Sequence, residues 1–111
     1  MSKSVYRTAK IFVQNQMAGI LSETDEGYRF QYDENYLSQK NPIAVSLTLP
    51  LQKEEYLSRT LFSFFDGLIP EGWLLNVVSK NWKIEKKDRF GILLTVCKDS
   101  IGDVSVVEID E

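Results

Sequence analysis

The spacing of hydrophobic residues changes along this chain, and that change constrains the fold more than any other feature of the sequence. Apolar side chains alternate with others in residues 28–32 and 43–49, whereas after residue 70 they recur three or four positions apart. Alternation indicates strands with one buried face, and the longer spacing indicates helices. We therefore predict an α+β domain, in which an antiparallel sheet, built from an N-terminal meander and later strands, packs against two or three helices.

The first half is predicted to open with a three-stranded meander. Residues 10–14 and 17–23 are apolar-rich runs separated by Asn15-Gln16, which predicts a hairpin with its tight turn at those two residues. A cluster of turn-forming residues then leads into the alternating run 28–32, which is the third strand.

The next segment is predicted to contain one more strand. Residues 33–41 are polar and fit a loop or a single helical turn. Residues 43–49 alternate and are followed by Pro50, which ends the strand. The predicted inner face consists of Ile43, Val45, Leu47 and Leu49.

The second half is predicted to contain two helices and a final strand. The first helix begins at Pro70, whose missing N–H costs nothing there, and Glu71 lies where the helix dipole favours negative charge. Trp73 falls outside the apolar stripe of this helix and is expected to be partly exposed. The second helix begins at Asp88, a good N-cap. The apolar stripe of the first helix contains Leu74, Leu75, Val78 and Trp82, and that of the second helix contains Phe90, Leu93, Leu94 and Cys97. The predicted final strand contains Val104, Val106 and Ile109.

The segment from Leu61 to Trp73 is unusually rich in aromatic residues. It holds four aromatics, two glycines and a proline, a density that indicates a packed corner with one aromatic left for a partner. Phe64 and Phe65 are adjacent, so they point in different directions on any regular element. One is expected in the core and the other outside, and the sequence does not say which.

Length and composition restrict the possible functions. The 111 residues are expected to form one domain, 1–111. One cysteine and no histidine exclude an internal disulfide, Ser-His-Asp and Cys-His catalysis, and the usual zinc sites. No Gly-rich phosphate loop occurs, so we expect no nucleotide cofactor and no metal. We expect a cytoplasmic location without a membrane partner, since no apolar run reaches the ~20 residues of a membrane span and no signal peptide is evident.

Carboxylates are the remaining candidates for catalysis. The adjacent acidic pairs at 25–26 and 33–34 lie on predicted turns and are expected to face water, without the desolvation that acid/base chemistry needs. Asp66 and Glu71 lie in the aromatic segment and are better placed. Their simpler interpretation is a turn cap and a helix-dipole partner.

Residues 80–89 form a basic segment, although the net charge of the chain is −3. Five basic side chains against two acidic ones, with Trp82 among them, could contact phosphates. The alternative is a solvated loop between helices, and a nucleic-acid-binding domain shows a larger basic face. We therefore expect no direct nucleic-acid partner.

Five segments, in order, resemble the N-terminal subdomain of HipA-type kinases. The strongest are Ser-Leu-Thr-Leu-Pro-Leu at 46–51 and Phe-Phe-Asp-Gly-Leu-Ile-Pro-Glu-Gly at 64–72. HipA-type proteins are toxins of bacterial toxin–antitoxin systems; they are serine/threonine kinases that phosphorylate aminoacyl-tRNA synthetases and pair with a helix-turn-helix antitoxin, HipB. The matching segments are 13–21, 28–32, 45–51, 64–72 and 99–102.

The resemblance implies a binding protein and not a kinase, because the family's ATP-binding and catalytic segments lie beyond this subdomain and the chain ends at Glu111. A separate subdomain of this kind is similar to HipS of the three-component HipBST arrangement. The resemblance thus implies an antitoxin, not an enzyme, that docks on and neutralises a HipT-like kinase toxin, with a HipB-like DNA-binding protein as a further partner. Two alternatives stay open: a non-inhibitory structural or regulatory module of such a complex, and the N-terminal fragment of a longer HipA-like kinase.

The predicted partner-binding surface is the aromatic corner. Trp73 is the expected anchor, because it lies off the helix's apolar stripe and tryptophan is enriched in interface hot spots. The alternative is that Trp73 covers the apolar base of the helix. Asp66 and Glu71 are expected to pair with basic groups around the kinase nucleotide site. The full predicted set is Phe64, Phe65, Asp66, Glu71 and Trp73.

Overall fold

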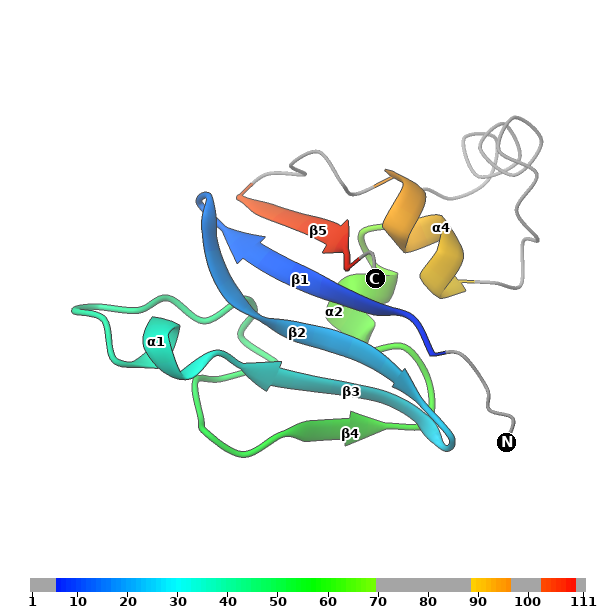
Figure 1. The fold of residues 1–111 in the computed structure, drawn as a ribbon, viewed down its shortest axis with the longest axis horizontal. Helices are drawn as coiled ribbons and strands as arrows, with labels where there is room; N and C mark the ends of the chain where they lie inside the picture. The colour runs from blue at the N-terminus through cyan, green and yellow to red at the C-terminus, as the bar shows by residue number, and fades with distance from the viewer. Residues whose placement is uncertain (1–5, 70–88, 97–102, 110–111) are drawn as a thin grey trace.

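A five-stranded antiparallel sheet forms the centre of the computed structural model, which describes residues 6–69, 89–96 and 103–109. The strands are β1 (Thr8–Val13), β2 (Gln16–Thr24), β3 (Gly27–Tyr32), β4 (Tyr56–Ser58) and β5 (Val104–Glu108), and the helices are α1 (Glu34–Leu37), α2 (Ser63–Asp66) and α4 (Arg89–Val96). The order across the sheet is β4-β3-β2-β1-β5, and Figure 1 shows α2 behind β1 and β2. This architecture confirms the predicted α+β class.

The N-terminal meander is confirmed, with its first turn displaced by one residue. β1, β2 and β3 pair as consecutive antiparallel strands. The tight turn between β1 and β2 uses Gln14 and Asn15, with φ of 50° and 68°, in place of Asn15 and Gln16. Two positive φ values are the mark of a type I′ hairpin turn, whose twist matches that of the flanking strands.

The predicted strand 43–49 is wrong. The segment contains only an isolated bridge between Ser46 and Leu49. Leu49 is buried as expected, but Leu47 is 97% exposed. The Ser46 Oγ accepts a hydrogen bond from the Thr48 N–H at 3.1 Å, a local turn that competes with strand pairing.

Another part of the sheet, β4, was not predicted. It has three residues and pairs with β3, placing Tyr56 opposite Phe30. Three residues are too few for alternation to be recognised. By contrast, of the two structures expected for 33–41, a loop or a single helical turn, the chain forms the helical turn α1, whose N-cap Asp33 accepts from the Tyr36 N–H at 3.2 Å.

The core lies between one face of the sheet and the helices α2 and α4. Phe30 of β3 and Phe65 of α2 are both fully buried, with ring centroids 5.6 Å apart. The helix predicted after Asp88 is confirmed as α4, and the last strand as β5. The helical residues buried in α4 include Phe90, Ile92, Leu93 and Leu94.

Several predicted features lie outside the described residues. These are the helix from Pro70 with its apolar stripe, the N-cap Asp88, the core position of Cys97, and residues 80–88 of the basic segment.

Candidate partner-binding site

Within the described residues, the aromatic corner is built on α2. Phe65 is fully buried, and its ring packs edge-to-face against Phe64 at 5.2 Å and Phe62 at 6.3 Å between centroids. Phe64 is only partly buried. The structure therefore identifies Phe65 as the core member of the adjacent pair, and Phe64 as the member that keeps exposed surface.

Asp66 ends α2 and links it to α4. The Nε of Arg89 donates to the Asp66 Oδ1 at 2.8 Å, and the side chains are 28% and 42% exposed. The carboxylate thus connects the two helices while keeping an exposed edge. The remaining predicted site residues, Glu71 and Trp73, lie outside the described residues.

A cleft of about 430 Å³ opens beside this ion pair. It brings together residues from β3, the chain after β4, α2 and α4. Its lining offers two guanidinium groups and several hydroxyl groups, so it can accept acidic or hydrogen-bonding side chains. The lining residues are Tyr28, Arg59, Thr60, Leu61, Ser63, Asp66 and Arg89.

Sequence reasoning missed Arg59 and Thr60 as candidate site residues. They lie in an ordinary polar stretch, and only the pairing of β3 with β4 brings them close to residues some 30 positions away along the chain. No local pattern in the sequence could have identified them.

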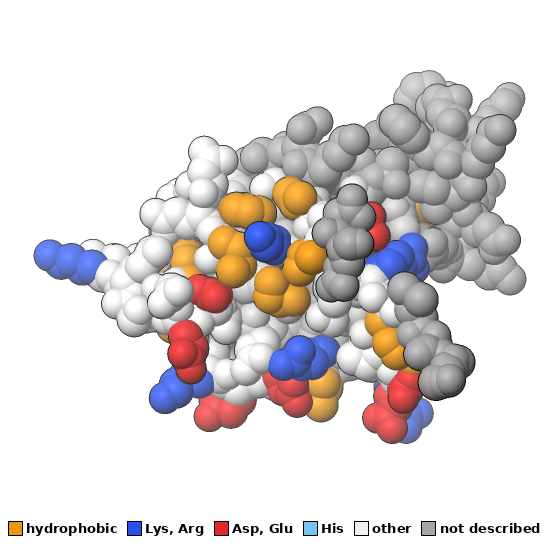
Figure 2. Space-filling view, viewed as in Figure 1, with side chains coloured by type: hydrophobic (Ala, Val, Ile, Leu, Met, Phe, Trp, Pro, Cys, Tyr) orange, Lys and Arg blue, Asp and Glu red, His pale blue; other side chains and the backbone are white. Residues whose placement is uncertain are grey.

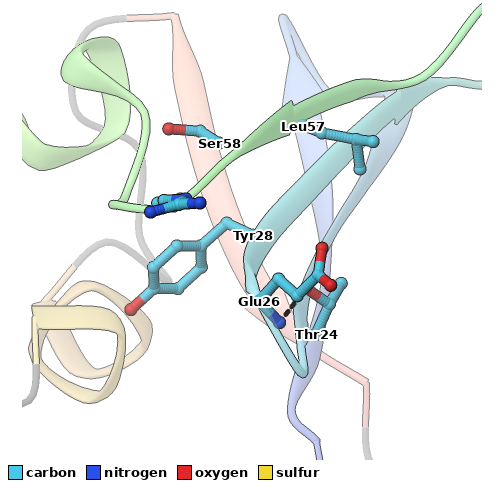
Figure 3. Close-up of a pocket in the computed structure, with 6 residues that line it drawn as sticks. Thr24, Glu26, Tyr28, Leu57 and Ser58 are labelled. Atoms are coloured by element: carbon cyan, nitrogen blue, oxygen red, sulfur yellow. Dashed lines mark hydrogen bonds between the residues drawn. The ribbon is translucent and has the colours of Figure 1, made fainter.

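A smaller pocket, of about 190 Å³, lies where β3 begins and β4 ends, and it shares Tyr28 and Arg59 with the cleft. Figure 3 shows the Tyr28 ring directed toward α4 and away from Thr24 and Glu26. Tyr28 contacts Phe90 of α4 edge-to-face, with ring centroids 5.9 Å apart. Tyr28 therefore forms a wall between the two depressions.

The turn carboxylates lie away from the cleft. The pair at 25–26 is exposed between β2 and β3, and Asp33 is the N-cap of α1. Within the described ranges, no three potential metal ligands of the His, Cys, Asp or Glu type lie together. The helices in the described part of the chain all lack the length and hydrophobicity of a membrane-spanning helix.

These features define a small α+β domain with an aromatic corner and an adjoining basic cleft. The chain belongs to the HipA N-terminal domain family, whose sequence profile matches residues 9–107. The resemblance drawn from the sequence is thereby confirmed.

Two relatives cover the chain almost completely. A Haemophilus influenzae protein described as uncharacterized is 31% identical over 106 residues, which are 96% of each chain. A solved structure described as the N-terminal domain of HipA toxin has 29% identity and a TM-score of 0.74, and the match covers 100% of this chain and 99% of that one.

Proposed function

We propose that this chain is a HipS-like cytoplasmic antitoxin that docks on a HipT-type serine/threonine kinase and neutralises it, with no catalytic activity of its own. The observation that carries the proposal is the match to a HipA N-terminal domain along the whole chain. A module of this family has a natural partner in a HipA-type kinase, because a domain of a larger protein presents an interface to the remainder, typically of about 600–1,500 Å².

The aromatic corner supports this proposal in its described part. Phe64 keeps exposed surface above the buried Phe65, and Asp66 keeps one edge in solvent beside a cleft with two arginines. In this proposal Phe65 supports the surface from inside, and Glu71 and Trp73 complete it. The chain acts as one domain, 1–111.

Co-expression with the cognate kinase tests the proposal. The kinase alone is expected to arrest growth, and the wild-type chain to restore it. Trp73→Ala and Phe64→Ala are expected to lose the rescue while keeping the folded circular dichroism spectrum. A chain that binds no purified kinase, or that hydrolyses ATP unaided, contradicts the proposal.

One observation favours a second candidate. The similar solved structure is described as a domain of the toxin itself. A module that supports the fold or assembly of a HipA-type kinase without inhibiting it is therefore the alternative. In the co-expression assay such a module binds the kinase but does not restore growth.

A further inference from the structure

The sheet has a second face, opposite the core, that carries an apolar surface. Alternate residues of β1 are buried, so Lys10 and Phe12 point to the opposite side. The strand register pairs Lys10 with Ile20 on one side and Val107 on the other, and pairs Phe12 with Met17. We call these five residues the open face.

The open face is exposed and has a cation at its centre. Lys10 is exposed, Val107 is 39% exposed, and Phe12, Met17 and Ile20 are each partly exposed. Figure 2 shows hydrophobic side chains gathered over β1 and β2 around a cationic side chain. None of the described α-helices covers this side of β1 and β2.

The side-chain ammonium of Lys10 forms no hydrogen bond or ion pair with any described residue. An ammonium group surrounded by apolar side chains is costly to cover unless the covering surface brings a carboxylate. A protein surface that complements the open face is therefore apolar and carries an acidic residue opposite Lys10.

A second copy of this chain does not meet that requirement. In a two-fold interface the same patch packs against itself, so a central Lys10 faces its own copy and like charges repel. The area is also small. The open face lies on the three strands β1, β2 and β5. Strands about 4.8 Å apart and roughly six residues long give it about 300 Å², or about 600 Å² counted over both partners, which suits an interdomain contact better than a stable dimer.

The position of β5 indicates which protein covers the open face. Val107 of the open face lies in β5, the last strand among the described residues. The similar solved structure is described as an N-terminal domain of a toxin, so further chain follows the domain in that protein, and in the present fold β5 with Val107 is the described strand nearest the C-terminus. We infer that the open face packs on the body of a HipA-type kinase, with a kinase carboxylate opposite Lys10. This inference rests on the proposed function and adds a second contact surface to the aromatic corner.

Lysine footprinting of the wild-type complex tests the inference without a mutation. Purified chain, free or bound to the purified kinase, is acetylated and digested, and the labelling rate of each lysine is measured by mass spectrometry. The rate at Lys10 is expected to fall at least about tenfold on binding. Lys40 is an exposed lysine on the loop after α1, and its rate is expected to stay unchanged.

Calorimetry with charge-reversed variants provides the second measurement. Lys10→Glu is expected to raise the Kd for the kinase by about tenfold or more, since a carboxylate then faces a carboxylate. Lys40→Glu makes the same charge change away from the sheet and is expected to leave the Kd unchanged. Circular dichroism verifies that both variants fold.

The outcomes separate this inference from the proposed function. If the wild-type chain binds the kinase while Lys10 stays reactive and Lys10→Glu binds equally well, the open face is not the contact, and only this inference fails. Failure of the wild-type chain to bind overturns both. The inference is also contradicted if the chain associates with itself through the open face. It is equally contradicted if the open face binds anionic phospholipid vesicles in place of the kinase.

Discussion

The hydroxyl of Tyr32 accepts a hydrogen bond from the Val45 N–H at 2.9 Å and donates one to the Leu49 carbonyl oxygen. Tyr32 lies at the end of β3, and its ring stacks on Tyr36, whose hydroxyl donates to the Ile43 carbonyl oxygen at 2.7 Å. Two tyrosines thus supply the hydrogen bonds that a neighbouring strand would otherwise give to the segment 43–49. The loop is attached to the sheet by side chains.

Tyr32→Phe is expected to destabilise the fold. The substitution leaves a buried N–H and a buried carbonyl without their partner, a loss of about 1–3 kcal/mol. Urea unfolding followed by circular dichroism measures it. Tyr6→Phe removes the hydroxyl of an exposed tyrosine and is expected to change stability by less than about 0.5 kcal/mol. Equal effects of the two substitutions would show that the hydrogen bonds of Tyr32 contribute little.

Tyr32 is also expected to make stability fall at alkaline pH. Burial raises its pKa from 10.0 to about 12. The folded state therefore holds the proton more tightly than the unfolded state, so this contribution is fully present below pH 10 and is lost as pH rises through 12. At about 1.4 kcal/mol per pKa unit the loss is on the order of 2–3 kcal/mol. Urea titrations between pH 9 and about pH 12 should show a steeper decline for the wild type than for Tyr32→Phe.

The segment 43–49 shows that the hydrophobic pattern of a sequence predicts burial but not strand pairing. Its alternation is genuine, and Val45 and Leu49 are indeed buried, but Leu47 points to solvent. Alternation reports which positions prefer burial, and it does not report whether another strand is available to pair with them. The meander was predictable because its partners are adjacent in sequence, whereas the bonds to Tyr32 join residues 13 and 17 positions apart.

Gly19→Ala is expected to disrupt the pairing of β2 with β3. A Cβ at this position would lie 2.5 Å from the Gln31 carbonyl oxygen and 2.9 Å from the Phe30 ring. Backbone in the centre of a sheet cannot move aside cheaply, so we expect a loss of about 3 kcal/mol in unfolding free energy. Gly67→Ala is the control, since its φ is −69° and its nearest contact is 3.2 Å. Thermal unfolding that ranks the two in the opposite order would contradict the β2–β3 packing described here.

The ion pair between Asp66 and Arg89 is expected to contribute little to stability. Both side chains are partly exposed, and pairs of this kind give about 0.2–1 kcal/mol. A double-mutant cycle with Asp66→Asn and Arg89→Gln, measured by urea unfolding, should give a coupling energy in that range that shrinks in high salt. A coupling above about 2 kcal/mol would mean that the pair is far better shielded than its exposure indicates.

The candidate site was predictable in composition but not in arrangement. The aromatic density of 61–73 marked the corner, but nothing in the sequence distinguished Phe64 from Phe65, because neighbouring positions on a short helix differ only in direction. Arg59 and Arg89 reach the cleft through strand and helix packing, which is set by the tertiary fold. Burial and long-range contacts therefore determine which of these residues pack in the core and which line the cleft, and residue type alone does not.

Phe64 and Phe65 are expected to separate stability from binding. Phe65→Ala removes a fully buried ring that packs against Phe30, so unfolding free energy should fall by about 3–5 kcal/mol. Phe64→Ala removes a partly exposed ring and should cost about 1 kcal/mol. If the aromatic corner contacts the kinase, Phe64→Ala raises the Kd measured by calorimetry at a temperature where both proteins are folded. Exposed Leu47, changed to Ala, controls for the loss of surface apolar area and is expected to leave both quantities unchanged. A Phe64→Ala variant with wild-type affinity would remove α2 from the docking surface.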